Sequence, residues 1–167
     1  MLFRSDGYHE IESLTVFADA GDVLALAPGP EFALAVDGPF QGLLDGENLI
    51  AKAVRLVREA AGGTLLSGQF RLTKNLPVAA GLGGGSADAA AALRLLQRVN
   101  PALARSVDWF DIARRLGADV PVCLAGHPAL MSGIGERLQP VVLPPAAILL
   151  VNPRVPLATA EVFRALA

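Results

Sequence analysis

The sequence predicts an α+β domain in which a mixed sheet packs against helices. Short apolar runs punctuated by glycine and proline dominate the first forty residues, and longer segments with helical spacing follow. Further strand-like runs lie between and after these helices, which favours an α+β arrangement over a strictly alternating parallel sheet. Because 53% of the 167 residues are hydrophobic and 18% are charged, the chain can bury a substantial core.

Three strands are predicted at the N-terminal end. Residues Ile11 to Ala18 and Val23 to Ala27 are rich in apolar and β-branched side chains, and the turn-forming sequence between them predicts two strands around a tight turn. A third strand covers Phe32 to Asp37, since Gly38 and Pro39 end the apolar pattern.

Helices and a fourth strand follow. Asn48 is a candidate N-cap for an amphipathic helix that stops at Gly62 and Gly63. Alternation predicts a strand over Gln69 to Lys74. An alanine-rich helix is expected from Ser86 to about Val99, where Asn100 and Pro101 end it.

The last third of the chain predicts one helix and three short strands. The helix runs from Val107 to Leu116, with Ser106 as its cap, and its charges follow the helix dipole. The strand candidates are Val120 to Leu124, Ala129 to Ser132 and Ile148 to Val151.

Net charge, hydropathy and cysteine content limit the classes of partner and the cellular location that the sequence predicts. The formal net charge of −2 removes the basic excess that nucleic-acid binding uses, so a small-molecule ligand is favoured and an RNA-binding domain is disfavoured. No apolar run is long enough to cross a bilayer, and the polar N-terminal residues predict no export signal, which favours a cytoplasmic protein without membrane partners. The single cysteine excludes an intramolecular disulfide.

A glycine-rich segment from Lys74 to Ala90 is the strongest chemical signal. Four glycines in five positions, between a strand and a helix start, let the backbone approach a ligand closely. The free N–H groups of the first helical turn then favour a phosphate. No lysine follows the last glycine, so this is not a Walker A loop, and Ser86 replaces the third glycine of a dinucleotide fingerprint. The alternative is a close-packed loop-to-helix junction.

Three other segments carry possible chemistry. Asp119 follows a predicted helix and enters an apolar run, where it is either satisfied by backbone N–H groups or accepts the proton of an attacking hydroxyl. Tyr8 and His9 follow an Asp-Gly turn, and they either form an ordinary hairpin end or stack on a base and bind its edge. The segment Gly133 to Glu136 predicts a bulge or a close backbone contact, and Glu136 is a candidate metal ligand.

Together these segments resemble the GHMP small-molecule kinases. The resemblance runs from Asp-Gly-Tyr-His through Leu-Pro-Val-Ala-Ala-Gly-Leu-Gly-Gly-Gly-Ser to Gly-Ala-Asp-Val-Pro. It implies that Asp119 is the catalytic base, that Tyr8 and His9 bind a cytosine and that Phe163 closes its other face. It also implies a set of residues around ATP: Asn48, Lys74, Pro77, Ala79, Gly81, Leu82, Gly83, Gly84, Gly85 and Ser86. Ser86 is the expected protein group near Mg²⁺.

The resemblance further implies a fold and a reaction. Residues 1–152 would form the family's N-terminal, nucleotide-binding domain, which is like the second domain of ribosomal protein S5, without its first lysine-bearing strand. Residues 153–167 would begin a C-terminal domain. The expected activity is ATP-dependent phosphorylation of a hydroxyl on a cytidine diphosphate-linked polyol in non-mevalonate isoprenoid synthesis. The alternatives are a nucleotide-binding fragment without turnover and a GHMP kinase for a sugar, homoserine or mevalonate.

Overall fold

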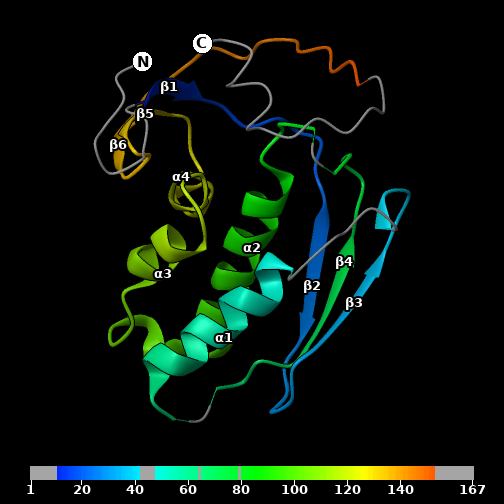
Figure 1. The fold of residues 1–167 in the computed structure, drawn as a ribbon, viewed down its shortest axis with the longest axis vertical. Helices are drawn as coiled ribbons and strands as arrows, with labels where there is room; N and C mark the ends of the chain where they lie inside the picture. The colour runs from blue at the N-terminus through cyan, green and yellow to red at the C-terminus, as the bar shows by residue number, and fades with distance from the viewer. Residues whose placement is uncertain (1–10, 42–47, 64, 79, 153–167) are drawn as a thin grey trace.

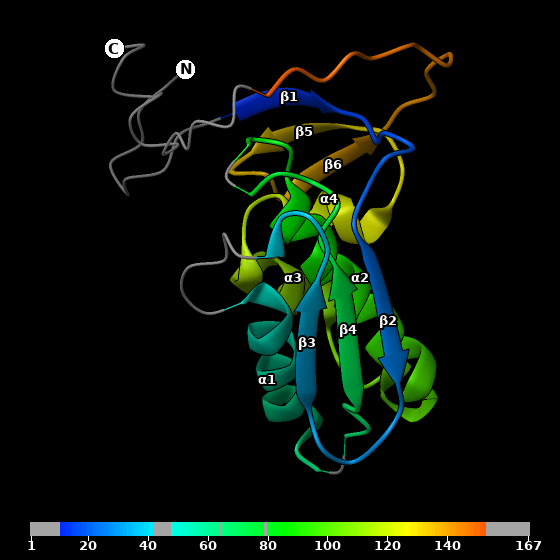
Figure 2. The ribbon, with the colours of Figure 1, turned by 90° about the vertical axis from the view of Figure 1, so that its right-hand side faces the viewer.

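The computed structural model describes residues 11–41, 48–63, 65–78 and 80–152. Figures 1 and 2 show a layer of helices packed on one face of a three-stranded sheet, with a second small sheet lying across one end of both layers. The expected α+β fold is therefore confirmed. Within the described ranges, no helix is both long enough and apolar enough to cross a membrane.

The larger sheet is mixed, as predicted. It has the order β2-β4-β3, formed by Val23–Ala27, Gln69–Thr73 and Ala33–Asp37. The central strand β4 runs antiparallel to β2 and parallel to β3. Its side chains alternate, so Phe70 and Leu72 are buried while Gln69 and Arg71 face solvent.

The core lies between this sheet and two long helices. Helix α1 covers Leu49–Ala61 and helix α2 covers Gly84–Val99. Their inward faces join Phe70 and Leu72 in one cluster of buried side chains, to which the two helices contribute Ile50, Val54, Val57, Leu93 and Leu96 among others. Helix α1 begins and ends as its sequence predicts, because the Asn48 side chain accepts the Ile50 N–H at 2.8 Å and Gly62 takes the left-handed C-cap conformation.

The second sheet corrects the hairpin expected near the N-terminus. Strand β1 is Ile11–Thr15, and it pairs with β5, Ala129–Gly133, instead of β2. Strand β6, Arg137–Pro140, completes the order β1-β5-β6 with antiparallel pairing throughout. Residues 16–22 are thus a connection between two sheets, as Figure 2 shows, and not the tight turn that local turn signals suggested.

Two helix assignments also differ from expectation. Helix α3 is Trp109–Leu116, capped by Asp108, whose carboxylate accepts the Asp111 N–H at 2.8 Å. Val107 lies outside this helix because its N–H donates to the Leu103 carbonyl in the turn of 3-10 helix η2, Pro101–Ala104. Helix α2 begins two residues earlier than predicted, at Gly84.

The apolar run after Asp119 forms a helix where a strand was expected. Residues Val120–Ala125 are the short helix α4, with Pro121 in its first turn and all of Val120 to Leu124 buried. A short run buried on all sides has no periodicity that distinguishes strand from helix. The strand expected at Ile148 to Val151 is absent from the described part of the chain, where those residues are exposed and have no regular secondary structure.

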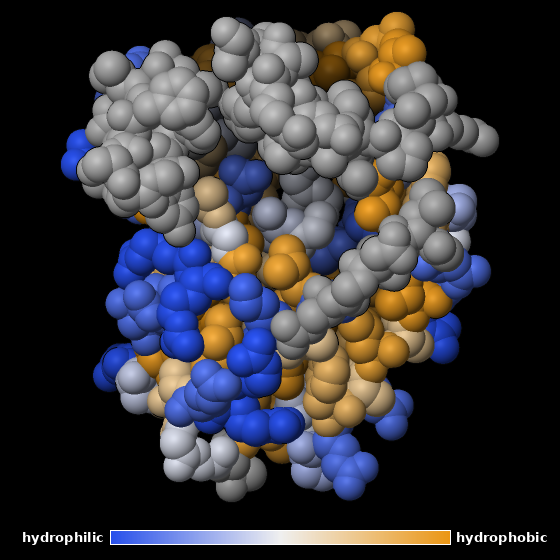
Figure 3. All heavy atoms as spheres, in the orientation of Figure 1, coloured by the Kyte–Doolittle hydropathy of each residue, from blue (hydrophilic) through white to orange (hydrophobic). Residues whose placement is uncertain are grey.

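Hydrophilic side chains gather over α1 and α3 in the view of Figure 3. Several of them pair with one another: Arg55 with Glu59 at 3.4 Å, Arg115 with Glu59 at 3.7 Å, and Arg114 with Asp111 at 3.4 Å. Because acids alternate with bases, this face is a solvated helix surface of mixed charge.

Candidate active site

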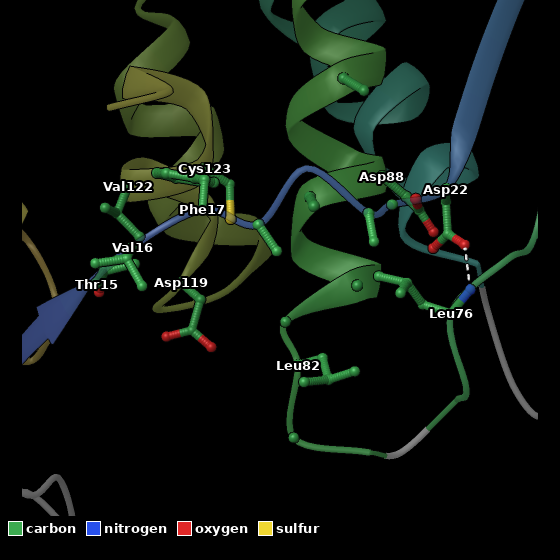
Figure 4. A pocket seen from close by; sticks show the side chains of 18 of the residues that line it. Thr15, Val16, Phe17, Asp22, Leu76, Leu82, Asp88, Asp119, Val122 and Cys123 are labelled. Atoms are coloured by element: carbon green, nitrogen blue, oxygen red, sulfur yellow. Dashed lines mark hydrogen bonds between the residues drawn. The ribbon is translucent and has the colours of Figure 1, made fainter. Parts of the chain in front are cut away.

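A cavity of about 600 Å³ lies where the two sheets and the helices meet. Its wall includes the glycine segment, the start of α4 and the connection between β1 and β2. Figure 4 shows Asp119 at the start of α4 across this space from Leu82 in the glycine segment. The volume is within the range of small-ligand pockets, about 300 to 1,000 Å³.

The glycine loop, which we define as residues 80–83, leads directly into helix α2 at Gly84. Gly83 is the N-cap residue with φ of 68°, a conformation that glycine adopts without strain, and no side chain caps the helix. The first intrahelical bond is made by the Ala87 N–H to the Gly83 carbonyl at 2.9 Å. The N–H groups before Ala87 therefore have no partner within the helix and lie at its positive end, which borders the cavity.

A buried charge cluster lies beneath this loop. We define it as Asp22, Lys74 and Asp88, which come from the start of β2, the end of β4 and the second turn of α2. The Lys74 ammonium donates to Asp22 and, at 3.0 Å, to Asp88, and the lysine side chain is only 3% exposed. A Cβ on Gly84 would lie 3.5 Å from Asp22 Oδ2 and 3.6 Å from Lys74 Nζ, so the cluster lies next to the helix start.

Asp22 also holds the strand that leads into the loop. Its Oδ1 accepts the N–H groups of Asn75 and Leu76 at 2.6 and 2.9 Å. Asn75 in turn donates from its side-chain amide to the Gly21 carbonyl at 3.1 Å. These bonds join the beginning of β2 to the end of β4 at the cavity edge.

The two carboxyls of the cluster titrate differently. Burial raises the pKa of Asp88 to about 6, and the nearby Asp22 charge adds to the rise while Lys74 opposes it. Burial also acts to raise the pKa of Asp22, but the hydrogen bond from Lys74, the backbone N–H bonds and the lysine charge outweigh it and lower that pKa. For Lys74, burial acts to lower the pKa, but its two carboxylate partners prevail and raise it. The cluster thus favours one firmly ionised carboxylate and one that can be protonated near pH 6.

Asp119 reaches the cavity from the junction of α3 and α4. The residue is exposed, and its backbone carbonyl accepts the Cys123 N–H at 3.2 Å in the first turn of α4. Its carboxylate makes no hydrogen bond or ion pair with the described part of the chain. It is therefore available to a ligand. Burial raises the pKa of the neighbouring Cys123 thiol to about 11, with a further contribution from the Asp119 charge.

The structure brings together some of the residues that the sequence singled out. Asp119 and residues Gly81 to Gly84 line one cavity. Among the described residues, Asn48, Lys74, Pro77, Gly85 and Ser86 do not line it. Asn48 caps α1, whose Leu49 touches the Gly85 position, and Lys74 is committed to the charge cluster. The predictions on Tyr8, His9, Ala79 and Phe163 lie outside the described residues.

Sequence reasoning missed two kinds of residue. Asp22 was interpreted as part of a turn and Asp88 as one residue of an alanine-rich helix, although a lone acid on a buried helix face signals a partner. The connection Val16 to Gly21 also lines the cavity, which the hairpin interpretation could not anticipate. Within the described part of the chain, no group of three or more potential ligands includes Glu136, whose Oε2 instead accepts the Ile134 N–H at 2.7 Å.

The chain is similar to curated kinases over nearly its whole length. It is 51% identical over 165 residues to 4-diphosphocytidyl-2-C-methyl-D-erythritol kinase of Bradyrhizobium sp. (strain ORS 278), covering 98% of this chain and 55% of that protein. It is 52% identical over 167 residues to the enzyme of the same name from Rhodopseudomonas palustris (strain HaA2), again covering 98% of this chain and 55% of the relative. The chain thus spans about half the length of these relatives.

Solved structures give the same picture. A crystal structure of 4-(cytidine 5′-diphospho)-2C-methyl-D-erythritol kinase matches 99% of this chain and 58% of its own, with 41% identity and a TM-score of 0.74. Homoserine kinase from Cytophaga hutchinsonii matches 86% of this chain and 50% of its own with 21% identity and a TM-score of 0.56, which is a likeness of fold.

A family model supplies the classification. The model described as the GHMP kinases N-terminal domain matches residues 48–127, the stretch that contains α1, the glycine loop and Asp119. With the fold and the near full-length similarity to kinases of this type, the match shows that the chain belongs to the GHMP kinase family.

Proposed function

We propose that this chain carries the nucleotide site and the catalytic base of a kinase that transfers a phosphoryl group from ATP to the 2-hydroxyl of 4-diphosphocytidyl-2-C-methyl-D-erythritol. The observation that carries the proposal is that the glycine loop and Asp119 line the same cavity. The names of the relatives support the choice of substrate, and Tyr8, His9 and Phe163 remain the proposed contacts of its cytosine.

In this proposal the backbone binds the nucleotide. The N–H groups at the start of α2 that have no partner within the helix would donate to the phosphates of ATP. Gly83, Gly84 and Gly85 have no Cβ, which lets the phosphates approach the main chain there. The remaining predicted contacts of the nucleotide are Asn48, Lys74, Pro77, Ala79 and Ser86. Of these, Lys74 would act through the charge cluster, since its amine already binds two carboxylates.

Asp119 would accept the proton of the acceptor hydroxyl as the oxygen attacks the γ-phosphorus of ATP. Phosphoryl transfer depends mainly on positioning and charge stabilisation, so a base that is held at the cavity and is unpartnered among the described residues suits this step. The bond between the γ-phosphorus and the bridging oxygen of ADP breaks, and the products are the phosphate ester and ADP.

Mg²⁺ would bind as a partner of the nucleotide, because magnesium in kinases is held largely by phosphates and water with few protein groups. Ser86, in the first turn of α2, is the proposed protein group beside it. When bound, the ion would neutralise charge on the β- and γ-phosphates.

The direct test uses the purified chain, ATP, magnesium and the proposed polyol substrate. We expect transfer to the 2-hydroxyl, and we expect Asp119→Asn to lower kcat by about 10² to 10⁴-fold, the usual contribution of a general base. Calorimetry should show ADP affinity within about twofold of the parent protein, because the glycine loop is intact in the variant. Unchanged turnover in Asp119→Asn would remove Asp119 from the mechanism.

The same experiments separate the alternatives. ADP binding without transfer to any acceptor would identify a nucleotide-binding fragment. Transfer to homoserine, mevalonate or a sugar, with no response to the cytidine compound, would identify a GHMP kinase with a different substrate.

A further inference from the structure

The carboxylate of Asp119 has no protein partner in the described part of the chain, so its position depends on the backbone that carries it. That backbone is the short segment Gly117 to Asp119 between α3 and α4. Its bonds are local: the Gly117 N–H donates to Ala113, and the Gly117 carbonyl accepts from Val120, both at 3.2 Å. These bonds tie the segment to its own helices but leave its distance from the second sheet to be set by packing.

The turn between β5 and β6 packs directly on this segment. Gly135 in that turn is buried, and a Cβ added to it would lie 2.7 Å from the Ala118 carbonyl oxygen and 3.4 Å from the carbonyl carbon. Real Cβ atoms do not approach backbone so closely, and Gly135 also has φ of 104°, a conformation that side chains disfavour. Only glycine allows the turn and the Ala118 peptide to touch.

The turn has its own internal support. The Gly135 N–H donates to the Ser132 carbonyl at 3.2 Å, and the Ile134 N–H donates to Glu136 Oε2 at 2.7 Å. The Glu136 carboxylate also occupies the space where a Cβ on Gly133 would lie. The Gly-Ile-Gly-Glu sequence therefore builds a compact turn whose apex presents bare backbone to Ala118.

We propose that Gly135 is a positioning residue for Asp119. Because Gly135 has no side chain, its backbone packs directly against the Ala118 peptide, and this contact sets how far the Asp119 carboxylate extends into the cavity. Glu136 acts one step further away by holding the turn. The kinetic consequence rests on the proposed kinase function, but the structural consequence does not. A misplacement of about 1 Å at a reacting group costs on the order of 10²-fold in rate.

The variant Gly135→Ala tests this directly, with Gly62→Ala as the matched control. Gly62 also has a positive φ, 59°, and it is the C-cap residue of α1. A Cβ added to Gly62 would have no atom within 4 Å. Both variants therefore carry backbone strain, and only Gly135→Ala pushes on Ala118. We expect kcat to fall by about 100-fold in Gly135→Ala, with calorimetric affinity for ADP unchanged, and neither value to change in Gly62→Ala.

A second readout needs no activity. Cys123 is the only cysteine of the chain, is buried, and donates its backbone N–H to Asp119. If the Ala118 peptide is displaced, the first turn of α4 loosens and the thiol reacts faster with a disulfide reagent such as dithionitrobenzoate. We expect faster labelling in Gly135→Ala than in the parent chain or Gly62→Ala. Equal labelling rates in all three proteins would overturn the proposal.

Glu136 keeps the proposal testable if Gly135→Ala does not fold. Glu136→Ala removes the acceptor of the Ile134 N–H, whereas Glu136→Gln retains an acceptor oxygen. We expect kcat to fall and thiol labelling to accelerate in Glu136→Ala, and both to return towards parental values in Glu136→Gln. Identical behaviour of the two variants would show that the turn does not act through this bond. A parent chain without kinase activity would contradict the proposed function, while the labelling comparison would still decide the positioning role.

Discussion

Lys74 shows how a charged residue can serve a ligand site without facing it. Its amine binds Asp22 and Asp88, and the cluster lies directly under Gly84. One cation between two carboxylates leaves the cluster with an excess negative charge when both acids are ionised. Burial is the main cause of the raised pKa of Asp88, and the nearby Asp22 charge adds to the rise. Protonating Asp88 makes the cluster neutral.

The titration of Asp88 predicts a pH-dependent stability. Its pKa in the folded protein, about 6, lies above the ordinary value of 3.8, so the folded state binds the proton more tightly than the unfolded state. The contribution of Asp88 is most favourable below pH 4 and is lost as pH rises through 6. Asp88→Asn cannot ionise, so it does not lose this stability as pH rises. The free energy of unfolding of Asp88→Asn minus that of the parent should therefore increase between pH 4 and 7. Urea unfolding at several pH values measures this difference.

Asp88→Ala is the control for the hydrogen bond. It removes both the charge and the acceptor of Lys74, so the lysine loses one of its two carboxylate partners. We expect this variant to be less stable than Asp88→Asn at every pH. A stability difference between Asp88→Asn and the parent that stays flat from pH 4 to 7 would contradict the raised pKa.

At the scale of elements, the residues at which helices α1 and α3 begin are set by the side chains that cap them. Asn48 caps α1 as its sequence predicts, because cap and periodic apolar positions agree. For α3 the sequence offers two candidate N-cap residues, Ser106 and Asp108. Asp108 is the N-cap because its carboxylate accepts the Asp111 N–H. Ser106 instead approaches the Leu103 carbonyl of the preceding turn at 3.5 Å.

This difference between the two caps can be measured. Asp108→Ala should lower the free energy of unfolding by about 1 kcal/mol, the usual cost of losing an N-cap. Ser106→Ala should change it by less than about 0.5 kcal/mol, as expected for an exposed position without such a role. Urea unfolding of the two variants beside the parent protein gives both values. A larger loss for Ser106→Ala than for Asp108→Ala would restore the boundary that the sequence first suggested.

At the scale of the whole molecule, one core joins the larger sheet to the helices. Leu93 on α2 is fully buried in the same cluster as Phe70 on β4 and Trp109 on α3. Helices α2 and α4 both line the cavity, and both also contribute buried side chains to this core. We therefore expect the helices and the larger sheet to unfold together.

Leu93→Ala tests this shared core. The substitution should lower the free energy of unfolding by about 2 to 5 kcal/mol, and Leu93→Met, which conserves volume, by less than about 1.5 kcal/mol. Fluorescence of Trp109, the only tryptophan, reports on α3, while far-ultraviolet circular dichroism reports on all elements. Both signals should shift together in each variant. Separate transitions would show that α3 and the sheet unfold as independent units.

The sequence by itself determined the features that depend on neighbouring residues. It predicted α1 with its caps, the strands β2 to β5 to within a residue or two, and the glycine loop before an alanine-rich helix, because backbone freedom, capping and periodicity act locally.

Only the tertiary structure decided which strands pair, whether Val120 to Leu124 is a strand or a helix, and that Asp22 and Asp88 meet at Lys74. These outcomes join residues as far apart in the sequence as Ile11 and Gly133, or they depend on burial from all sides. Pairing and desolvation between distant segments leave no periodic trace in either segment alone.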